Sequence, residues 1–201
     1  MKPITIAIAA ALIAGCTVRS DERGFLVATK LIEATAPAGS TACVYDAATN
    51  ENVFGFFDPA VGYDHALVVE NRLPSNAATG PGRLNTNDFQ VEGATITTEV
   101  LVGPVQSVAT QTVPANGRIP VGQAAAVGIA LAQPGAILGG SDVRFHIQIF
   151  GSLADGSKVK TNTYPYAAHA IAGFTLASTC TGTQASLFCE GRSQDTGIAC
   201  Q

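Results

Sequence analysis

Short segments in which apolar and polar residues alternate run through the chain, and residues 143–149 form the clearest of them. There Val, Phe and two Ile alternate with Arg, His and Gln, which is the period-two pattern of a strand with one buried face. Asp155 and Gly156 follow, and because both residue types tolerate positive φ, they predict a two-residue turn. Residues 158–164 alternate again, so the sequence predicts a hairpin, with Pro165 at the end of its pairing or at a sheet edge.

A second alternating run starts at Phe89 and changes phase at Gly93, after which the even-numbered residues from Ala94 to Val102 share one face. A glycine at such a phase change is typical of a β-bulge, in which one extra residue is inserted into a strand. Further strands are expected over residues 25–33, 42–46, 53–57 and 66–71, and loops over 74–76, 80–82, 85–88, 114–117 and 134–135.

Residues 123–133 fit two kinds of element. The segment is rich in Ala, a strong helix former, yet Val127, Ile129 and Leu131 alternate with small residues, and Gly128 lies among them. We expect a strand here. A short helix that crosses the end of a sandwich is the alternative.

Turn signals every ~10–15 residues, without the alternation of strands and helices that builds parallel sheets, predict an all-β protein with an antiparallel β-sandwich. From about residue 64 to 177 the order of strands resembles that of an immunoglobulin-like (Ig-like) domain, although the chain has no Trp. Residues 25–63 are expected to add an N-terminal strand extension to the same core. The predicted core residues are Val68, Val69, Phe89, Val91, Ile96, Val100, Val127, Ile129, Leu131, Phe145, Ile147 and Ile149.

The composition narrows the functional classes. Charged residues make up 13% of the chain, against about 25% in an average soluble protein, and the net charge is −4. A nucleic-acid partner is therefore not expected, because such proteins neutralise phosphates with a basic surface. The 47% of hydrophobic residues also argues against disorder. No apolar run reaches the ~18 residues of a membrane-spanning helix.

The N-terminus has the pattern of a secretory signal peptide. Lys2 precedes an apolar run over residues 4–14 that ends in small residues. Residues 12–16 (LIAGC) resemble the lipobox of bacterial lipoproteins, which has an aliphatic residue, two small residues and a cysteine. The resemblance implies cleavage before Cys16 and attachment of acyl chains to that cysteine, and two or more chains give stable membrane attachment. An ordinary secretory peptide and a buried N-terminal helix are the alternatives.

This resemblance sets the expected domain organisation and location. We expect a signal peptide over residues 1–15, a lipidated tether over 16–24, a β-sandwich domain over 25–178 and a Cys-rich tail over 179–201. Thr17 follows the cysteine in place of the Asp that marks retention in the inner membrane. The outer membrane is therefore expected, with the protein on its periplasmic face or on the cell surface.

The remaining cysteines are Cys43, Cys180, Cys189 and Cys200. An even number in an exported chain predicts two disulfides, with three possible connectivities. A Cys189–Cys200 bond would close a small loop and leave Cys43 to tie an N-terminal strand to Cys180. None of the spacings is the CxxC of zinc or redox sites. The tail is poor in apolar residues, so it needs such cross-links to be held in place.

A second resemblance spans much of the mature chain on short motifs. Residues 68–73 (VVENRL), 151–156 (GSLADG) and 193–195 (SQD) are similar to those of uncharacterised envelope lipoproteins of myxobacterial type. The resemblance implies no activity.

Motifs of catalysis and cofactor binding are absent from the sequence, which has no GxSxG, HExxH, P-loop, GxGxxG or EF-hand pattern. We therefore expect no enzyme activity and no cofactor or metal. His146 is expected on the surface and His169 at the end of a strand. Asp64 and His65 are expected in a loop that caps a strand; in the alternative, a hydrolase of envelope polysaccharide or peptide, they would act with a neighbouring carboxylate.

Two segments are candidates for ligand binding. Residues 85–88 (NTND) offer oxygen ligands for Ca²⁺, but a turn stabilised by Asx hydrogen bonds is the better interpretation. Phe54, Phe56 and Phe57 lie so close together that one strand face cannot bury all three, because Phe56 and Phe57 point to opposite sides. Burial beneath the N-terminal extension is the favoured interpretation; in the alternative, one of them is exposed and contacts a partner protein or a sugar ring.

The sequence as a whole predicts a lipid-anchored protein of the cell envelope that acts as a binding or structural module. Its expected partners are the membrane, through the N-terminal lipid, and an envelope protein or glycan that the sequence does not identify.

Overall fold

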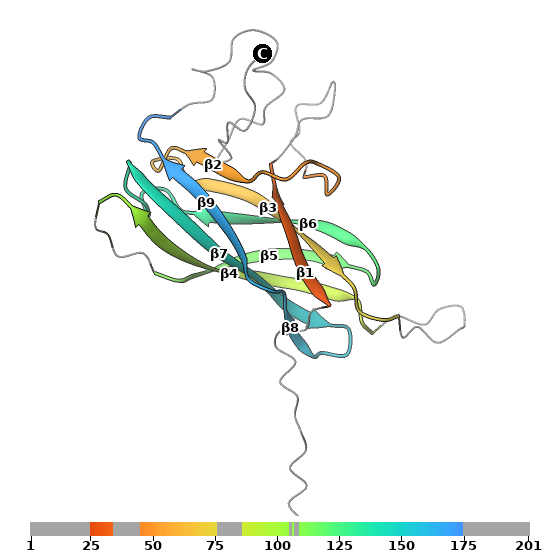
Figure 1. Cartoon of the computed structure of the whole chain (residues 1–201). Helices are drawn as coiled ribbons and strands as arrows, with labels where there is room; N and C mark the ends of the chain where they lie inside the picture. The colour runs from red at the N-terminus through yellow and green to blue at the C-terminus, as the bar shows by residue number, and fades with distance from the viewer. Residues whose placement is uncertain (1–24, 34–44, 76–85, 105, 107–108, 175–201) are drawn as a thin grey trace, which may run out of the picture.

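The computed structural model of the chain describes residues 25–33, 45–75, 86–104, 106 and 109–174. Strands and no helix occur in these residues (Figure 1). The strands are β1 (Leu26–Ile32), β2 (Phe54–Phe57), β3 (Tyr63–Asn71), β4 (Phe89–Val102), β5 (Gln111–Ile119), β6 (Ala124–Ala132), β7 (Ser141–Leu153), β8 (Lys158–Lys160) and β9 (Tyr164–Ala170). The prediction of an all-β fold is confirmed.

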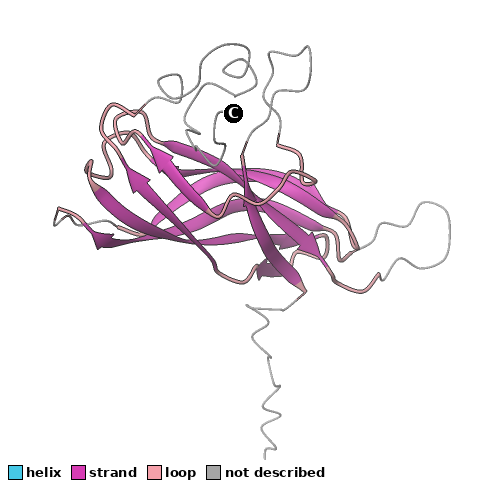
Figure 2. Ribbon diagram, turned by 45° about the horizontal axis from the view of Figure 1, so that its top comes forward, coloured by secondary structure: helices cyan, strands magenta, loops and turns pink. Residues whose placement is uncertain are grey.

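The strands form two sheets that enclose one core (Figures 1 and 2). A three-stranded sheet has the order β1-β3-β6, and all its pairs are antiparallel. A six-stranded sheet has the order β2-β9-β7-β4-β5, and β8 pairs with β7. The N-terminal strands contribute to this core as expected, since Leu26, Leu31 and Phe57 belong to it.

The six-stranded sheet is mixed, which corrects the expectation of a purely antiparallel sandwich. β2 runs parallel to β9, with Phe54 opposite Ala167 and Phe57 opposite Ala170. A tight hairpin can join only antiparallel strands, and more than a hundred residues separate this pair. No short turn therefore constrains the direction of β2.

The predicted hairpin after residue 149 is confirmed, with a longer turn. β7 and β8 pair antiparallel, Ser152 opposite Lys158. The Gly156 N–H donates to the Leu153 carbonyl and the Leu153 N–H to the Ser157 carbonyl, so three residues form the loop instead of two. Gly156 has a φ of 86°, which fits the three-residue hairpin loop that ends in a left-handed residue.

The predicted second strand, residues 158–164, is broken in the structure. β8 ends at Lys160, and Asn162 lies between β8 and β9. Its side chain accepts a hydrogen bond from the Ala28 N–H at 2.7 Å and donates to the Ala28 carbonyl at 3.3 Å. The amide thus replaces a strand neighbour at the edge of β1, and it links the two sheets. Pro165 lies in β9 beyond the last residue paired with β2, in agreement with the predicted edge position.

The predicted bulge in β4 is confirmed. The register shifts between Val91 and Gly93 against both β5 and β7. Ala94 and Ile96 are fully buried on the shared face, whereas Val102 is exposed. Residues 124–132 form a strand, so the helix alternative for this segment is wrong.

Two expected elements are corrected. Residues 114–117 were expected in a loop but belong to β5, the last strand of the six-stranded sheet. Pro114 is tolerated because it lies opposite the bulge at Gly93. The expected strand over 42–46 is described only at Tyr45 and Asp46, which are not in a strand. Tyr45 instead packs on the face of the three-stranded sheet that points away from the main core.

The predicted core is confirmed at eleven of its twelve residues, which are buried; Val100 is half-buried. Val68 lies in a second, smaller cluster with Ile32 and Ala66, on the face of the three-stranded sheet that points away from the main core.

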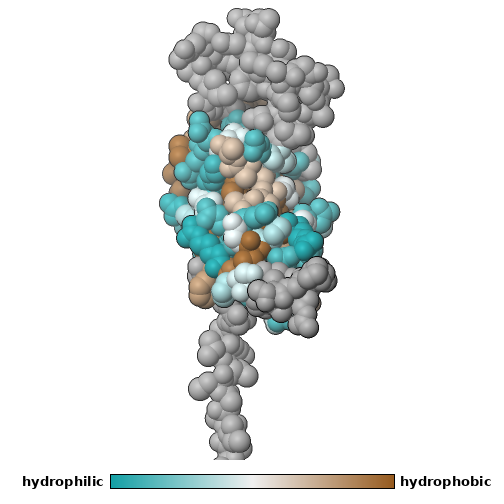
Figure 3. All heavy atoms as spheres, turned by 90° about the vertical axis from the view of Figure 1, so that its right-hand side faces the viewer, coloured by the Kyte–Doolittle hydropathy of each residue, from teal (hydrophilic) through white to brown (hydrophobic). Residues whose placement is uncertain are grey.

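Figure 3 looks at the molecule from the right-hand side of Figure 1 and shows hydrophilic residues along both flanks, with apolar residues between them. None of the described residues lies in a helix that could cross a membrane.

Candidate functional site

The face of the six-stranded sheet that points away from the three-stranded sheet carries most of the candidate chemistry, and we call it the outer face. Along β7 every second side chain is half-buried on this face, while the alternating ones are buried in the core. The outward residues of β7 are Asp142, Arg144, His146, Gln148, Phe150 and Ser152.

At the β2 end of the outer face, two of the three predicted phenylalanines lie side by side. Phe54 is 39% exposed, and its ring centroid lies 5.2 Å from that of Phe56 in an edge-to-face arrangement. The Phe56 ring also lies 6.3 Å from the His169 ring and 6.2 Å from the Phe174 ring. We call Phe54, Phe56, His169 and Phe174 the aromatic corner.

Phe57 points the other way, as the alternation of side chains requires. It is fully buried and stacks on Tyr63 with ring centroids 4.6 Å apart. The expectation that one strand face cannot bury all three rings is therefore confirmed, and Phe57 is a core residue without access to a ligand. Its burial lies between the two sheets rather than beneath the N-terminal extension.

Charged side chains continue from the aromatic corner across the outer face. His169 Nδ1 contacts the Asp142 carboxylate. Glu99 on β4 lies 3.4 Å from Arg144 and 3.3 Å from His146 Nε2. His146 thus points to the surface, as expected. His169 is the second-last residue of β9 and pairs with Asp142, in agreement with its expected position at the end of a strand. Each of these contacts joins an acidic side chain to a basic one, so the opposite charges on the outer face largely cancel. The face can therefore bind polar groups without a strong net electrostatic field.

Asp64 and His65 do not form the pair that a hydrolase would need. Both lie within β3 rather than in a loop, and successive residues of a strand point to opposite faces. His65 is fully buried, and its Nδ1 lies 3.0 Å from the Ile32 carbonyl oxygen. Its ring packs against Tyr63 and Tyr166. The side chain serves the core, because no substrate can reach it there.

Asp88, the carboxylate of the expected turn at 85–88, is also structural. It is buried, and its carboxylate binds the Arg118 guanidinium and accepts a hydrogen bond from the Val121 N–H at 3.1 Å. The hydrogen bond from Arg118 lowers the pKa of Asp88, against a smaller opposing effect of burial. A Ca²⁺ ion would have to displace Arg118. Within the part of the chain that the structure describes, no three His, Cys, Asp or Glu side chains lie close enough to hold a metal.

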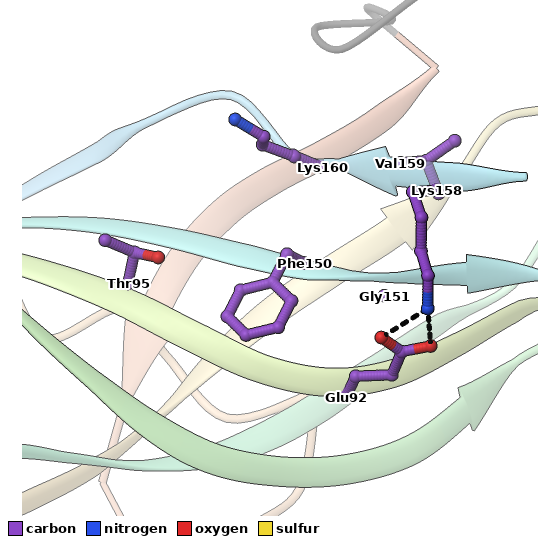
Figure 4. Close-up of a pocket in the computed structure, with 7 residues that line it drawn as sticks. All are labelled: Glu92, Thr95, Phe150, Gly151, Lys158, Val159 and Lys160. Carbon is purple, nitrogen blue, oxygen red and sulfur yellow. Dashed lines mark hydrogen bonds and ion pairs between the residues drawn. The ribbon is translucent and has the colours of Figure 1, made fainter.

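A hollow that the sequence did not reveal lies at the other end of the outer face. It has a volume of about 350 Å³ and is lined by Glu92, Thr95, Phe150, Gly151, Lys158, Val159 and Lys160. We call it the Phe150 hollow (Figure 4). Lys158 Nζ lies 2.6 and 2.8 Å from the two carboxylate oxygens of Glu92. Hydrogen bonds from Lys158 and then Ser152 lower the pKa of Glu92. The signal in the sequence was a phenylalanine, Phe150, at a polar-face position of its strand and a bulge glycine, Gly93, on the strand that pairs with it.

One tyrosine links the loop before β2 to β9. The Tyr164 hydroxyl donates to Glu51 at 2.5 Å. Burial, followed by this hydrogen bond to a carboxylate, raises the pKa of Tyr164 to about 12. The residues expected to carry the lipid and the disulfides, Cys16 and the four other cysteines, lie outside the described residues.

Comparisons of the chain with protein-family models, with curated proteins and with solved structures found no match. The function is therefore argued from the chemistry of the outer face and from the N-terminal sequence pattern.

Proposed function

We propose that the protein is a lipid-anchored component of the bacterial outer membrane that works as a binding module, with the outer face of its six-stranded sheet turned to an envelope glycan or protein. The anchor is inferred from the LIAGC motif at residues 12–16. The two disulfides among Cys43, Cys180, Cys189 and Cys200 belong to the same proposal, since exported proteins meet an oxidising compartment. An Ig-like relationship of the sandwich is proposed as well, supported by two sheets over one core.

The observation that carries the binding role is a pair of outward rings, the exposed Phe54 and the half-buried Phe56. Two aromatic rings on the outside of a sheet lose the free energy that burial would give them, which is about 1.5–3 kcal/mol for a full side chain. Clusters of exposed apolar residues rimmed by polar ones mark interaction sites. Here the rim consists of the His169–Asp142 and Glu99–Arg144 pairs. The corner can therefore stack on a partner's apolar surface while its rim bonds to polar groups.

The position of the corner fits a tethered module. β1 begins at the end of the sandwich where β8 lies, and β2 lies at the opposite end (Figure 1). A tether over residues 16–24 spans at most roughly 30 Å when extended. An anchor at Cys16 would thus hold the β8 end near the bilayer and direct the aromatic corner away from it.

Binding to isolated, detergent-washed envelopes tests the role of the corner. We expect the double variant F54A/F56A to lose at least tenfold in affinity, and the control F25A to bind as the wild type does. Phe25 is the matched control because it is an exposed phenylalanine, 49% accessible, at the other end of the sandwich. Protease treatment of the envelopes separates a protein partner from a glycan. Equal binding by F54A/F56A and the wild type would refute the role of the corner.

The anchor has a separate test. Changing Cys16 to Ser should move the protein from the membrane fraction to the soluble fraction, and the wild-type chain should carry acyl groups by mass spectrometry. Retention of the C16S protein in the membrane would refute the lipid anchor without bearing on the corner.

A further inference from the structure

We propose that the Phe150 hollow binds a single sugar unit that carries an anionic group, such as a uronic acid residue of an acidic glycan. The site is separate from the aromatic corner. Phe54 pairs with Ala167, and Ala167 pairs with Arg144. Phe150 lies six positions further along β7 from Arg144. At ~3.4 Å per residue this is roughly 20 Å.

The bulge at Gly93 creates the floor of the hollow. A Cβ atom on Gly93 would lie 2.6 Å from Cζ of Phe150 and 2.9 Å from the Val113 carbonyl oxygen. The Phe150 ring therefore rests directly on the backbone of Gly93, in a place that only glycine leaves free. A ring supported in this way from below is held on the sheet and presents apolar surface to a ligand.

The walls of the hollow carry polar groups on two sides of this ring. In Figure 4 the Phe150 ring lies between Thr95 and the Glu92–Lys158 pair, and Lys160 extends above it from β8. β8 has only three residues, and beyond it Thr161 and then β9 take over as the neighbours of β7 on that side. Lys158 leans over the sheet face to Glu92 on β4 instead of extending along the sheet edge. Its contact with Glu92 fixes both groups before a ligand arrives.

This arrangement matches the surface of a sugar ring. Ligand pockets are mostly apolar, with a few polar groups that fix the orientation, and the volume of the hollow lies at the lower end of their usual ~300–1,000 Å³. The apolar C–H face of a sugar can stack on Phe150. Its hydroxyls can donate to the Glu92 carboxylate, whose lowered pKa keeps it ionised, and accept from Lys158.

The charge of the hollow selects for an anionic substituent. Glu92 and Lys158 neutralise each other, which leaves the charge of Lys160, and the structure shows no ion pair of Lys160 with another described residue. The chain as a whole carries −4, so a locally positive hollow is a departure from its surroundings. A carboxylate or sulfate on the sugar would lie against the Lys160 ammonium.

The test is a titration of the full-length chain with trigalacturonate, followed by calorimetry or by ligand-observed NMR. A ligand of this size in a shallow site is expected to bind with a dissociation constant of about 1 mM. Maltotriose, which is neutral, should bind at least fivefold more weakly. Inorganic phosphate should not compete at equal concentration.

Variants assign the binding to the hollow. F150A should weaken trigalacturonate binding at least tenfold, and F150Y, which keeps the ring, should stay within threefold of the wild type. K160A should remove the preference for trigalacturonate over maltotriose and the salt dependence of binding, and K160R should keep both. R72A removes an exposed cation that does not line the hollow and serves as the control for charge.

Some outcomes would overturn the proposal. These are no binding of trigalacturonate by the wild type, equal binding of maltotriose, competition by phosphate, or F150A and K160A variants that bind as the wild type does. F150A is compared only when its circular dichroism matches that of the wild type, and K160A decides when it does not. The F54A/F56A variant should bind trigalacturonate normally, so a failure of the aromatic corner and a failure of the hollow remain distinguishable.

Discussion

Asn71 at the end of β3 is expected to be one of the most sensitive polar positions in the protein. The residue is 1% exposed. Its side-chain NH₂ group donates to the carbonyls of Asn87 and Ile119, both at 2.9 Å, and its side-chain oxygen accepts from the Leu73 N–H at 3.1 Å. One amide therefore ties β3 to the start of β4, to the end of β5 and to the segment that follows β3.

The cost of Asn71→Ala follows from these three bonds. A typical hydrogen bond contributes a net ~0.5–1.5 kcal/mol, and a buried group left without its partner costs ~1–3 kcal/mol. Three bonds give an expected loss of about 3 kcal/mol in the free energy of unfolding. With a urea m-value of about 2 kcal/mol/M, the unfolding midpoint should fall by about 1.5 M. Asn71→Asp should be at least as destabilising, because a carboxylate cannot donate to the two carbonyls.

The assay is urea unfolding followed by circular dichroism, with Asn116→Ala as the control. Asn116 is exposed on β5, and its replacement should change the free energy of unfolding by less than about 0.5 kcal/mol. A midpoint for Asn71→Ala within 0.3 M of the wild type would refute the reasoning, since it would mean that the three bonds contribute nothing beyond what water supplies.

Three further predictions concern packing and pH. A Cβ atom on Gly151 would lie 2.0 Å from the Gln90 carbonyl oxygen and 2.8 Å from Cε2 of Phe89, so Gly151→Ala should destabilise the protein by at least about 3 kcal/mol. Gly128→Ala is the control, because its Cβ would meet Tyr45 at an ordinary 3.6 Å. Equal unfolding midpoints of the two variants would contradict the packing argument. The lowered pKa of Asp88 means that its stabilising contribution is fully present above pH ~4, the usual pKa of Asp, and is lost as the pH falls through the folded-state pKa. Asp88→Asn should therefore be less stable than the wild type at pH 7, and thermal unfolding scans should show this difference shrink towards pH 2. A difference that stays constant with pH would show that ionisation of Asp88 has no part in it. For Tyr164, the raised pKa of about 12 means that the tyrosine ionises first in the unfolded chain as the pH rises above ~10. The free energy of unfolding should therefore fall between pH 10 and 12, and Tyr164→Phe should remove part of this loss. A pH series of urea unfolding would detect the difference, and a parallel decline in both proteins would contradict the prediction.

Segments whose structure depends on local pattern could be predicted from the sequence. The alternation over residues 143–149 identified β7, and the phase change at Gly93 identified the bulge, because both depend on the two-residue period of a strand. The alternating Val127, Ile129 and Leu131 likewise predicted a strand despite the Ala-rich composition, since burial outweighed helix propensity.

Features that depend on distant partners could not be predicted in this way. Asn162 breaks the predicted strand because Ala28, 134 residues away, offers it two backbone bonds. Pro114 occupies a strand because its neighbour is a bulge. The Phe150 hollow exists because a glycine on β4 lies beneath the ring and Lys158 of β8 leans over to Glu92. None of these partners can be recognised from the local sequence.

The parallel pairing of β2 with β9 has a consequence for how the chain reaches its folded state. Phe54–Phe57 cannot pair until Ala167–Ala170 is available, and β1 and β3 depend on strands that lie well beyond them in the sequence. Folds dominated by such non-local pairs form slowly, in milliseconds to seconds. In a chain that emerges N-terminus first, the six-stranded sheet therefore stays incomplete until β9 has emerged. In the export that we propose for this protein, slow folding of this kind would keep that sheet open during passage through a membrane channel.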